Sequence, residues 1–138
     1  MGRILAIDFG SKKTGLAVTD PLGLIATPLD TVATDRLMAF LKDYVPRQAV
    51  SCILMGEPSD YNGEPAPIVE QIENFLRGLE KRFPGVTIEV LDESLSSRDA
   101  RKALLHSGLG RKKRADKWRV DQVAATIMLQ EYLETRQA

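Results

Sequence analysis

Residues 4 to 15 of this chain, ILAIDFGSKKTG, decide how its N-terminal part folds. Four apolar residues in a row, Ile4 to Ile7, predict a strand that is buried on both faces. Asp8 follows directly, at a place where burial of an unpaired charge would be costly. A group that offsets the charge of Asp8 is therefore expected opposite it.

The sequence beyond this strand (3–8) predicts an α/β domain. Pro28 favours an edge position or a bulge for the third strand. The elements expected after the first strand are strands at 15–19 and 23–32, a helix capped by Thr34 or Asp35 and ended by Pro46, a strand at 49–55, a helix at 68–83, a strand at 86–91, and helices at 96–107 and 117–134. The first three strands are close enough in sequence to form an antiparallel meander. We therefore predict one domain over residues 1–138, with a central mixed five-stranded sheet flanked by helices.

Length and composition are those of an ordinary globular domain. The chain has 138 residues, of which 43% are hydrophobic and 28% charged. A domain near this length can bury about 70% of the surface that its unfolded chain exposes. The single cysteine excludes an internal disulfide, and no apolar run approaches the roughly 18 residues of a membrane span. Because the N-terminus also lacks a signal-peptide pattern, we expect a cytoplasmic protein.

The formal net charge of zero hides an uneven distribution. From residue 98 to residue 119, nine basic residues against two acidic ones give a net charge of +7, so the rest of the chain carries −7. The basic residues are Arg98, Arg101, Lys102, Arg111, Lys112, Lys113, Arg114, Lys117 and Arg119. This segment is either a solvated loop or a surface for an anionic partner. A nucleic acid is favoured over a membrane, because no amphipathic anchor rich in large apolar residues accompanies the charges.

Three acidic positions stand at the ends of predicted elements. Asp8 closes the first strand, Glu93 closes the fifth, and Asp121 lies in the first turns of the last helix. Functional groups of open α/β sheets gather at the carboxyl ends of adjacent strands. If strands one and five approach each other there and the last helix crosses their ends, these three carboxylates converge. The small residues Ala124 and Ala125 would let that helix come close to the sheet.

Converging carboxylates repel one another unless a cation neutralises them. Oxygen ligands without histidine or thiolate suit Mg²⁺ or Mn²⁺, and a chain with His106 as its only histidine does not favour a zinc site. Two such ions about 3.5–4 Å apart can activate a water and stabilise the leaving oxygen of a phosphodiester. Taken singly, each acid could instead serve a turn or a helix terminus.

Three blocks of the chain, AIDFGSKKTGLAV, LDESLSS and WRVDQVAATIML, resemble the signature blocks of the YqgF/RuvX family. This family is a branch of the ribonuclease H-like superfamily, and its members are described as Holliday junction resolvases or as pre-16S rRNA nucleases. The resemblance covers essentially the whole chain. It implies an RNase H-like fold and a nuclease that uses Mg²⁺ or Mn²⁺, held by an aspartate, a glutamate and an aspartate. Those roles fall on Asp8, Glu93 and Asp121.

Two positions depart from the family pattern. The acidic pair of the second block is usually followed by arginine, whereas Ser94 stands here, so Arg98 or the basic segment would have to hold a phosphate oxygen instead. The fourth strand usually ends in Gly-Leu-Pro, and here Glu57 replaces the leucine. Glu57 is therefore a candidate fourth metal ligand, or a residue that shifts the preference among metals.

The residues expected to contact nucleic acid surround the acids. Lys12 lies on the turn after Asp8, although it and Lys13 could equally be solvated turn residues. The others are Arg98, Arg111, Lys112, Lys113, Arg114 and Arg119, which would follow the phosphate backbone without reading its sequence.

Three alternative interpretations remain at this stage. An actin-like or sugar-kinase phosphate loop would need a duplicated domain, which 138 residues do not supply. A binding module for nucleic acid or ribosome assembly would not need all three carboxylates. A junction resolvase would need a homodimer to make paired cuts, and no dimer seam is evident in the sequence.

Overall fold

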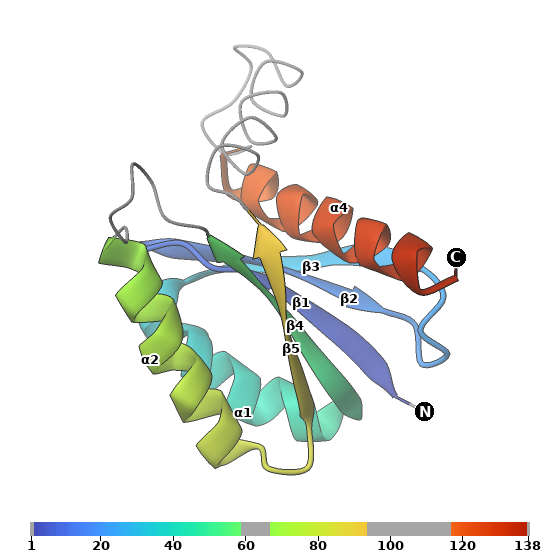
Figure 1. The fold of residues 1–138 in the computed structure, drawn as a ribbon, viewed down its shortest axis with the longest axis horizontal. Coiled ribbons are helices and arrows are strands. Elements are labelled where there is room, and N and C mark those ends of the chain that lie inside the picture. Colours follow the sequence, from blue (N-terminus) through green and yellow to red (C-terminus); the bar gives the residue numbers. More distant parts are fainter. Residues whose placement is uncertain (1, 59–66, 94–116, 138) are drawn as a thin grey trace.

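The computed structural model describes residues 2–58, 67–93 and 117–137, and these form one sheet with helices on both sides (Figure 1). The elements are β1 (Arg3–Asp8), β2 (Lys13–Thr19), β3 (Ala26–Ala33), the 3₁₀ helix η1 (Thr34–Arg36), α1 (Leu37–Arg47), β4 (Val50–Pro58), α2 (Pro67–Arg82), β5 (Thr87–Glu93) and α4 (Lys117–Gln137). The helix expected at 96–107 lies outside the described residues. Among the helices of the described ranges, none combines the length and apolar character needed to cross a membrane.

The strand order is β3-β2-β1-β4-β5. β1 to β3 form the expected antiparallel meander, β4 pairs parallel to β1, and β5 pairs parallel to β4. The predicted mixed five-stranded sheet is therefore confirmed. The expectation that strands one and five approach each other needs correction, because β4 lies between them.

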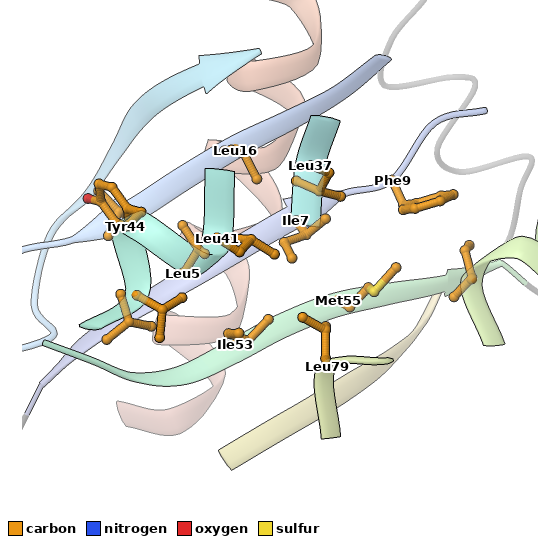
Figure 2. Close-up of a cluster of buried hydrophobic side chains, with 14 residues drawn as sticks. Leu5, Ile7, Phe9, Leu16, Leu37, Leu41, Tyr44, Ile53, Met55 and Leu79 are labelled. Atoms are coloured by element: carbon orange, nitrogen blue, oxygen red, sulfur yellow. The ribbon is translucent and has the colours of Figure 1, made fainter. Parts of the chain in front are cut away.

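The sheet is apolar on both faces, as four consecutive apolar residues in β1 predict. Leu5 and Ile7 belong to the core beneath α1 and α2, which Figure 2 shows in close-up together with Leu41, Met55 and Leu79. The opposite face of the sheet packs against α4 and forms a second core with it. The buried residues of this core are Ile4, Ala6, Ala17 and Leu54 from the sheet and Ala125, Met128, Leu129 and Leu133 from α4. Figure 1 shows α4 on one side of the sheet and α1 with α2 on the other. Successive residues of β1 thus contribute to two separate cores.

Three details near β3 and α1 test the expectations for the proline and capping residues. β3 is an edge strand whose register with β2 shifts between Leu16 and Ala17, next to Pro28, as expected for proline in a strand. α1 ends at Arg47, one residue after Pro46, so the proline lies in the last turn, where it removes one backbone N–H donor just before the helix stops. The predicted caps Thr34 and Asp35 are also wrong, since they form η1 and no side chain caps α1.

Candidate functional site

Asp8 and Asp121 come together on the α4 side of the sheet. Asp8 is the last residue of β1, is 4% exposed and pairs across the ladder with Gly15 of β2. Ala6, two residues earlier, belongs to the core beneath α4, and the alternation of a strand assigns Asp8 to the same face. Asp121, in the second turn of α4, is 5% exposed. Two carboxylates are therefore buried on one face of the sheet.

Gly15 explains how α4 reaches this position. A Cβ atom at Gly15 would collide with the backbone carbonyl of Asp121 and would lie 2.7 Å from the amide nitrogen of Gln122. The helix backbone thus rests directly on β2, at the residue that pairs with Asp8. Ala124 and Ala125 are buried along the same helix, as their small size predicts. A glycine inside a strand is a recognised sign of close backbone approach, although sequence alone does not say which element approaches.

Lys13 makes an ion pair with Asp121. Its Nζ atom lies 3.3 Å from Oδ2 of Asp121, and the two side chains are 34% and 7% exposed. Lys13 precedes Gly15 by two residues, so both stand on the α4 face of β2. The interpretation of Lys13 as a solvated turn residue is thus wrong, whereas Lys12 is exposed and its role stays a prediction.

A network of hydroxyl groups fixes the turn that carries these lysines. The Thr34 hydroxyl donates to the carbonyl of Gly10 at 2.6 Å, and the hydroxyls of Thr14 and Thr34 lie 2.9 Å apart. The backbone N–H of Thr34 also donates to the carbonyl of Lys12 at 2.9 Å. Thr14 is completely buried, so the turn is tied to the start of η1 from the inside. Asp8 and Lys13 therefore extend from a firmly held backbone.

Glu93 and Glu57 are placed through their backbones alone. Glu93 is the last residue of β5 and pairs with Pro58 of β4, and Glu57 pairs with Asp92. The parallel strands β1, β4 and β5 all end on the same side of the sheet, so both acids stand at the strand ends beside the end of β1 at Asp8. Their side chains, and that of Arg119 in α4, lie outside what the structure describes, as do residues Arg98, Arg111, Lys112, Lys113 and Arg114.

The described donors suit a hard divalent cation. Carboxylate oxygens are the ligands that Mg²⁺ and Mn²⁺ prefer, and two buried carboxylates close together favour a bound cation. Among described side chains, no group of three or more His, Cys, Asp or Glu residues is close enough to hold a metal ion. The described part of the predicted ligand set consists of Asp8 and Asp121.

A separate hollow of about 560 Å³ lies at the other end of the sheet, between the start of β1 and the last turns of α4. Cys52 lines it, and burial, with a smaller contribution from the negative charge of Glu89, raises the pKa of this thiol to about 11. A thiol with so high a pKa is almost wholly protonated at neutral pH and is a poor nucleophile. Glu89 also lines the hollow, and its carboxylate accepts hydrogen bonds from Cys52 and Tyr132.

Comparisons with known proteins match the chain to one family model and to relatives along nearly its whole length. The family model RuvX, described as Holliday junction resolvase, matches residues 2–135. A relative in Flavobacterium psychrophilum is 45% identical over 133 residues, which cover 96% of this chain and 97% of the relative. One in Porphyromonas gingivalis is 47% identical over 134 residues and 97% of each chain. Both relatives carry the provisional name pre-16S rRNA nuclease.

Solved structures support the fold. The structure of Thermus thermophilus RuvC in complex with a Holliday junction substrate matches with a TM-score of 0.57 and 19% identity, over all of this chain and 97% of that one. A second structure of the same Thermus protein gives a TM-score of 0.55 at 18% identity. At this identity the likeness concerns the fold, and it confirms the expected RNase H-like architecture.

Proposed function

The chain belongs to the RuvX family, and on that premise we propose that it is a metal-dependent nuclease that hydrolyses phosphodiester bonds in precursor 16S rRNA in the cytoplasm. One observation carries the proposal. The backbone of α4 at Asp121 rests on Gly15, directly across the ladder from Asp8, so that two buried carboxylates share one site. The names of relatives at 45% and 47% identity support RNA as the substrate.

Asp8 and Asp121 would hold Mg²⁺ or Mn²⁺, with Glu93 as the third ligand and two ions as the expected number. When bound, such ions supply Lewis-acid chemistry at the phosphodiester group. Asp8 is fixed by the central strand β1, and Asp121 by the contact of α4 with Gly15. Fixed ligands of this kind set the ion positions before the substrate arrives, which reduces the reorganisation needed during the reaction.

The face of the sheet to which each position belongs favours Glu93 over Glu57 as the third ligand. Leu91, two residues before Glu93, packs with the core beneath α4, which is the face of Asp8. Met55, two residues before Glu57, packs in the core on the opposite face. Because residues two apart share a face of a strand, Glu93 is the better candidate, and Glu57 is assigned to a modulating role.

The substrate would be held by charge rather than by base recognition. Lys12 is exposed beside the site, and the segment from residue 98 to residue 119 has a net charge of +7. Cations of this kind neutralise phosphates, fix the register of the strand and carry no sequence information. We assign Lys12, the basic segment and Arg119 to this role.

The test compares wild type, Asp8→Asn and Asp43→Asn, an exposed acid of α1 that serves as a charge-matched control. Each protein receives a labelled 16S precursor RNA, single-stranded DNA or a four-way junction, with Mn²⁺, Mg²⁺ or EDTA. We expect metal-dependent cleavage of the RNA by wild type and the control. In folded Asp8→Asn it should fall at least about 100-fold, because loss of even an outer-shell partner of a metal ligand costs 10–100-fold.

Each other outcome contradicts a defined part of the proposal. Full cleavage by folded Asp8→Asn would contradict the metal centre. Preferred cleavage of the junction would replace the rRNA assignment with the resolvase activity named by the family model, and would require a dimer to make paired cuts. Binding without cleavage under every metal condition would indicate a binding module.

A further inference from the structure

Lys13 supplies a cation at Asp121 before any metal is bound. We propose that Lys13 is a built-in counter-ion of the site: its ammonium group neutralises Asp121 in the metal-free protein and leaves Asp121 when a divalent cation binds. This inference rests on the proposed metal centre. It gives Lys13 a positioning role that differs from the substrate-binding role assigned to its neighbour Lys12.

The first argument is the unequal burial of the two partners. Asp121 Oδ2 lies 3.3 Å from Lys13 Nζ, and the Asp121 side chain is 7% exposed whereas that of Lys13 is 34% exposed. A lysine side chain has a long flexible stem and can move its charged end into water. Asp121 is held by the helix backbone that rests on Gly15. The ammonium can therefore leave while the carboxylate stays.

The second argument is charge balance. Asp8 and Asp121 are both buried, 4% and 5% exposed, and two negative charges on the same face of the sheet repel each other. A positive charge at Asp121 offsets part of that repulsion when no metal is present. The ammonium comes from the same face of β2 as Gly15, the residue that pairs with Asp8. Lys13 thus places a positive charge on the side of the sheet where both acids are buried.

The third argument is competition for one atom. A carboxylate oxygen that coordinates a divalent cation cannot keep an ammonium group at ion-pair distance without bringing two cations together. Release of Lys13 therefore accompanies metal binding at Asp121, and the ion pair lowers the affinity for the metal. The turn that carries Lys13 is tied down by Thr14 and Thr34, so the side chain rather than the backbone makes the movement.

The experiment measures Mn²⁺ binding to the metal-free full chain by isothermal titration calorimetry, without nucleic acid. Lys13→Met keeps most of the stem and removes the charge, and Lys13→Gln is a second neutral variant. We expect the Kd for Mn²⁺ to fall about fivefold in both, the upper end of what a partly exposed ion pair contributes. Lys42→Gln, at an exposed lysine of α1, is the matched control and should keep the wild-type Kd.

A second readout is stability. In EDTA, both neutral Lys13 variants should melt at a lower temperature than wild type, and saturating Mn²⁺ should reduce that difference. An unchanged or higher Kd in Lys13→Met and Lys13→Gln, with folding verified by circular dichroism, would overturn the counter-ion role.

Failure of the proposed function has a different signature. Wild-type protein that binds no Mn²⁺, or Asp8→Asn and Asp121→Asn that bind it as wild type does, would overturn the metal centre and the counter-ion role with it. Loss of binding in the Asp variants with a wild-type Kd in Lys13→Met would overturn the counter-ion role alone.

Discussion

The ladder between β1 and β2 has a buried threonine and an aspartate at each end, and the two ends use them differently. At one end, the Thr14 hydroxyl helps to fix the turn that follows Asp8, and Asp8 is buried beneath α4. At the other end, the Thr19 hydroxyl accepts a hydrogen bond from Ile4 N–H and donates to the carbonyl of Asp20. The Asp20 carboxylate accepts hydrogen bonds from backbone N–H groups of its own loop.

The two aspartates differ in what their oxygens do. The Asp20 carboxylate accepts three backbone N–H groups, from Leu22 at 3.0 Å, Leu24 at 2.9 Å and Ile25 at 2.7 Å. Asp8 is instead buried on the face of the sheet that α4 covers, the helix in which Asp121 makes its ion pair with Lys13. An aspartate that organises backbone amides stabilises the fold, whereas one buried beside another acid costs stability and is retained for another reason. The same residue type thus has a structural role at one end of the ladder, and at the other end we propose that it is a metal ligand.

The largest loss of stability is expected from Gly15→Ala. This substitution would push α4 away from the end of the β1–β2 ladder where Asp8 lies. The new Cβ meets the backbone of Asp121, which cannot turn away as a flexible side chain could. Overpacking of this kind typically costs about 1–3 kcal/mol and sometimes more, so the free energy of unfolding should fall by about 3 kcal/mol. Urea denaturation measures this change. Cleavage should be lost as well, since Asp121 moves.

Gly85→Ala is the matched control, because a Cβ there meets nothing within 4 Å. Its free energy of unfolding should stay within about 1 kcal/mol of wild type. A Gly15→Ala protein as stable and active as Gly85→Ala would show that the close approach of α4 to β2 is not needed.

Asp8→Asn and Asp20→Asn should change stability in opposite directions at pH 7 in EDTA. Asp8→Asn removes one of two buried like charges, so the free energy of unfolding should rise by about 1 kcal/mol, as is common for changes that relieve a functional site. Asp20→Asn places an amide donor where backbone N–H groups are accepted, so stability should fall. Chemical denaturation of both variants measures the two signs. If both variants lose stability, the contrast between the two ends is wrong.

The smallest expected effect is the pH dependence of the stability that the Asp20 hydrogen bonds contribute. The hydrogen bond from Ile25 N–H is the largest cause that holds the pKa of Asp20 below its usual value of 3.8, and those from Leu24 and Leu22 add to it. Because the folded-state pKa is lowered, the stabilisation is present above the unfolded value and is lost as the pH falls through the folded value. The difference in melting temperature between wild type and Asp20→Asn should be constant from pH 7 to about 5 and shrink below about 4. A difference that stays constant from about pH 5 to the lowest pH at which both proteins remain folded would rule out this explanation.

The sequence predicts the elements best where their side chains are uniformly apolar. β1 has the predicted bounds because four apolar residues precede a charged one. In α4, the buried residues Ala125 and Met128 and the partly buried Tyr132 pack against the sheet, and Asp121 is buried on the same helix. β4 extends three residues beyond the prediction, to Pro58, because backbone pairing with β5 continues where apolar character stops. Strand ends are thus set by pairing partners, which composition does not reveal.

The acidic site is predictable to the extent that it depends on strand ends. The approach of Asp8 and Asp121 follows from their positions at element ends, and the roles of Glu93 and Glu57 stay predictions. The Lys13–Asp121 ion pair depends on which helix lies over β2. Gly15 signals that some backbone comes close, and only the folded chain shows that it belongs to Asp121. Contacts between residues more than one hundred positions apart therefore need the tertiary structure.

The placement of Asp121 on α4 has a consequence for the order of events during protein synthesis. A chain that is still being translated carries Asp8, Lys13 and Gly15 long before Asp121 is made. Until α4 docks, one face of the sheet is uncovered, with Ile4, Ala6, Ala17 and Leu54 open to water. When α4 docks, it buries that face of the sheet and brings the Asp121 carboxylate to the site in the same step. The proposed hydrolytic site therefore comes into being together with the finished core, so a nascent chain in contact with ribosomal RNA carries no assembled site until α4 has been made.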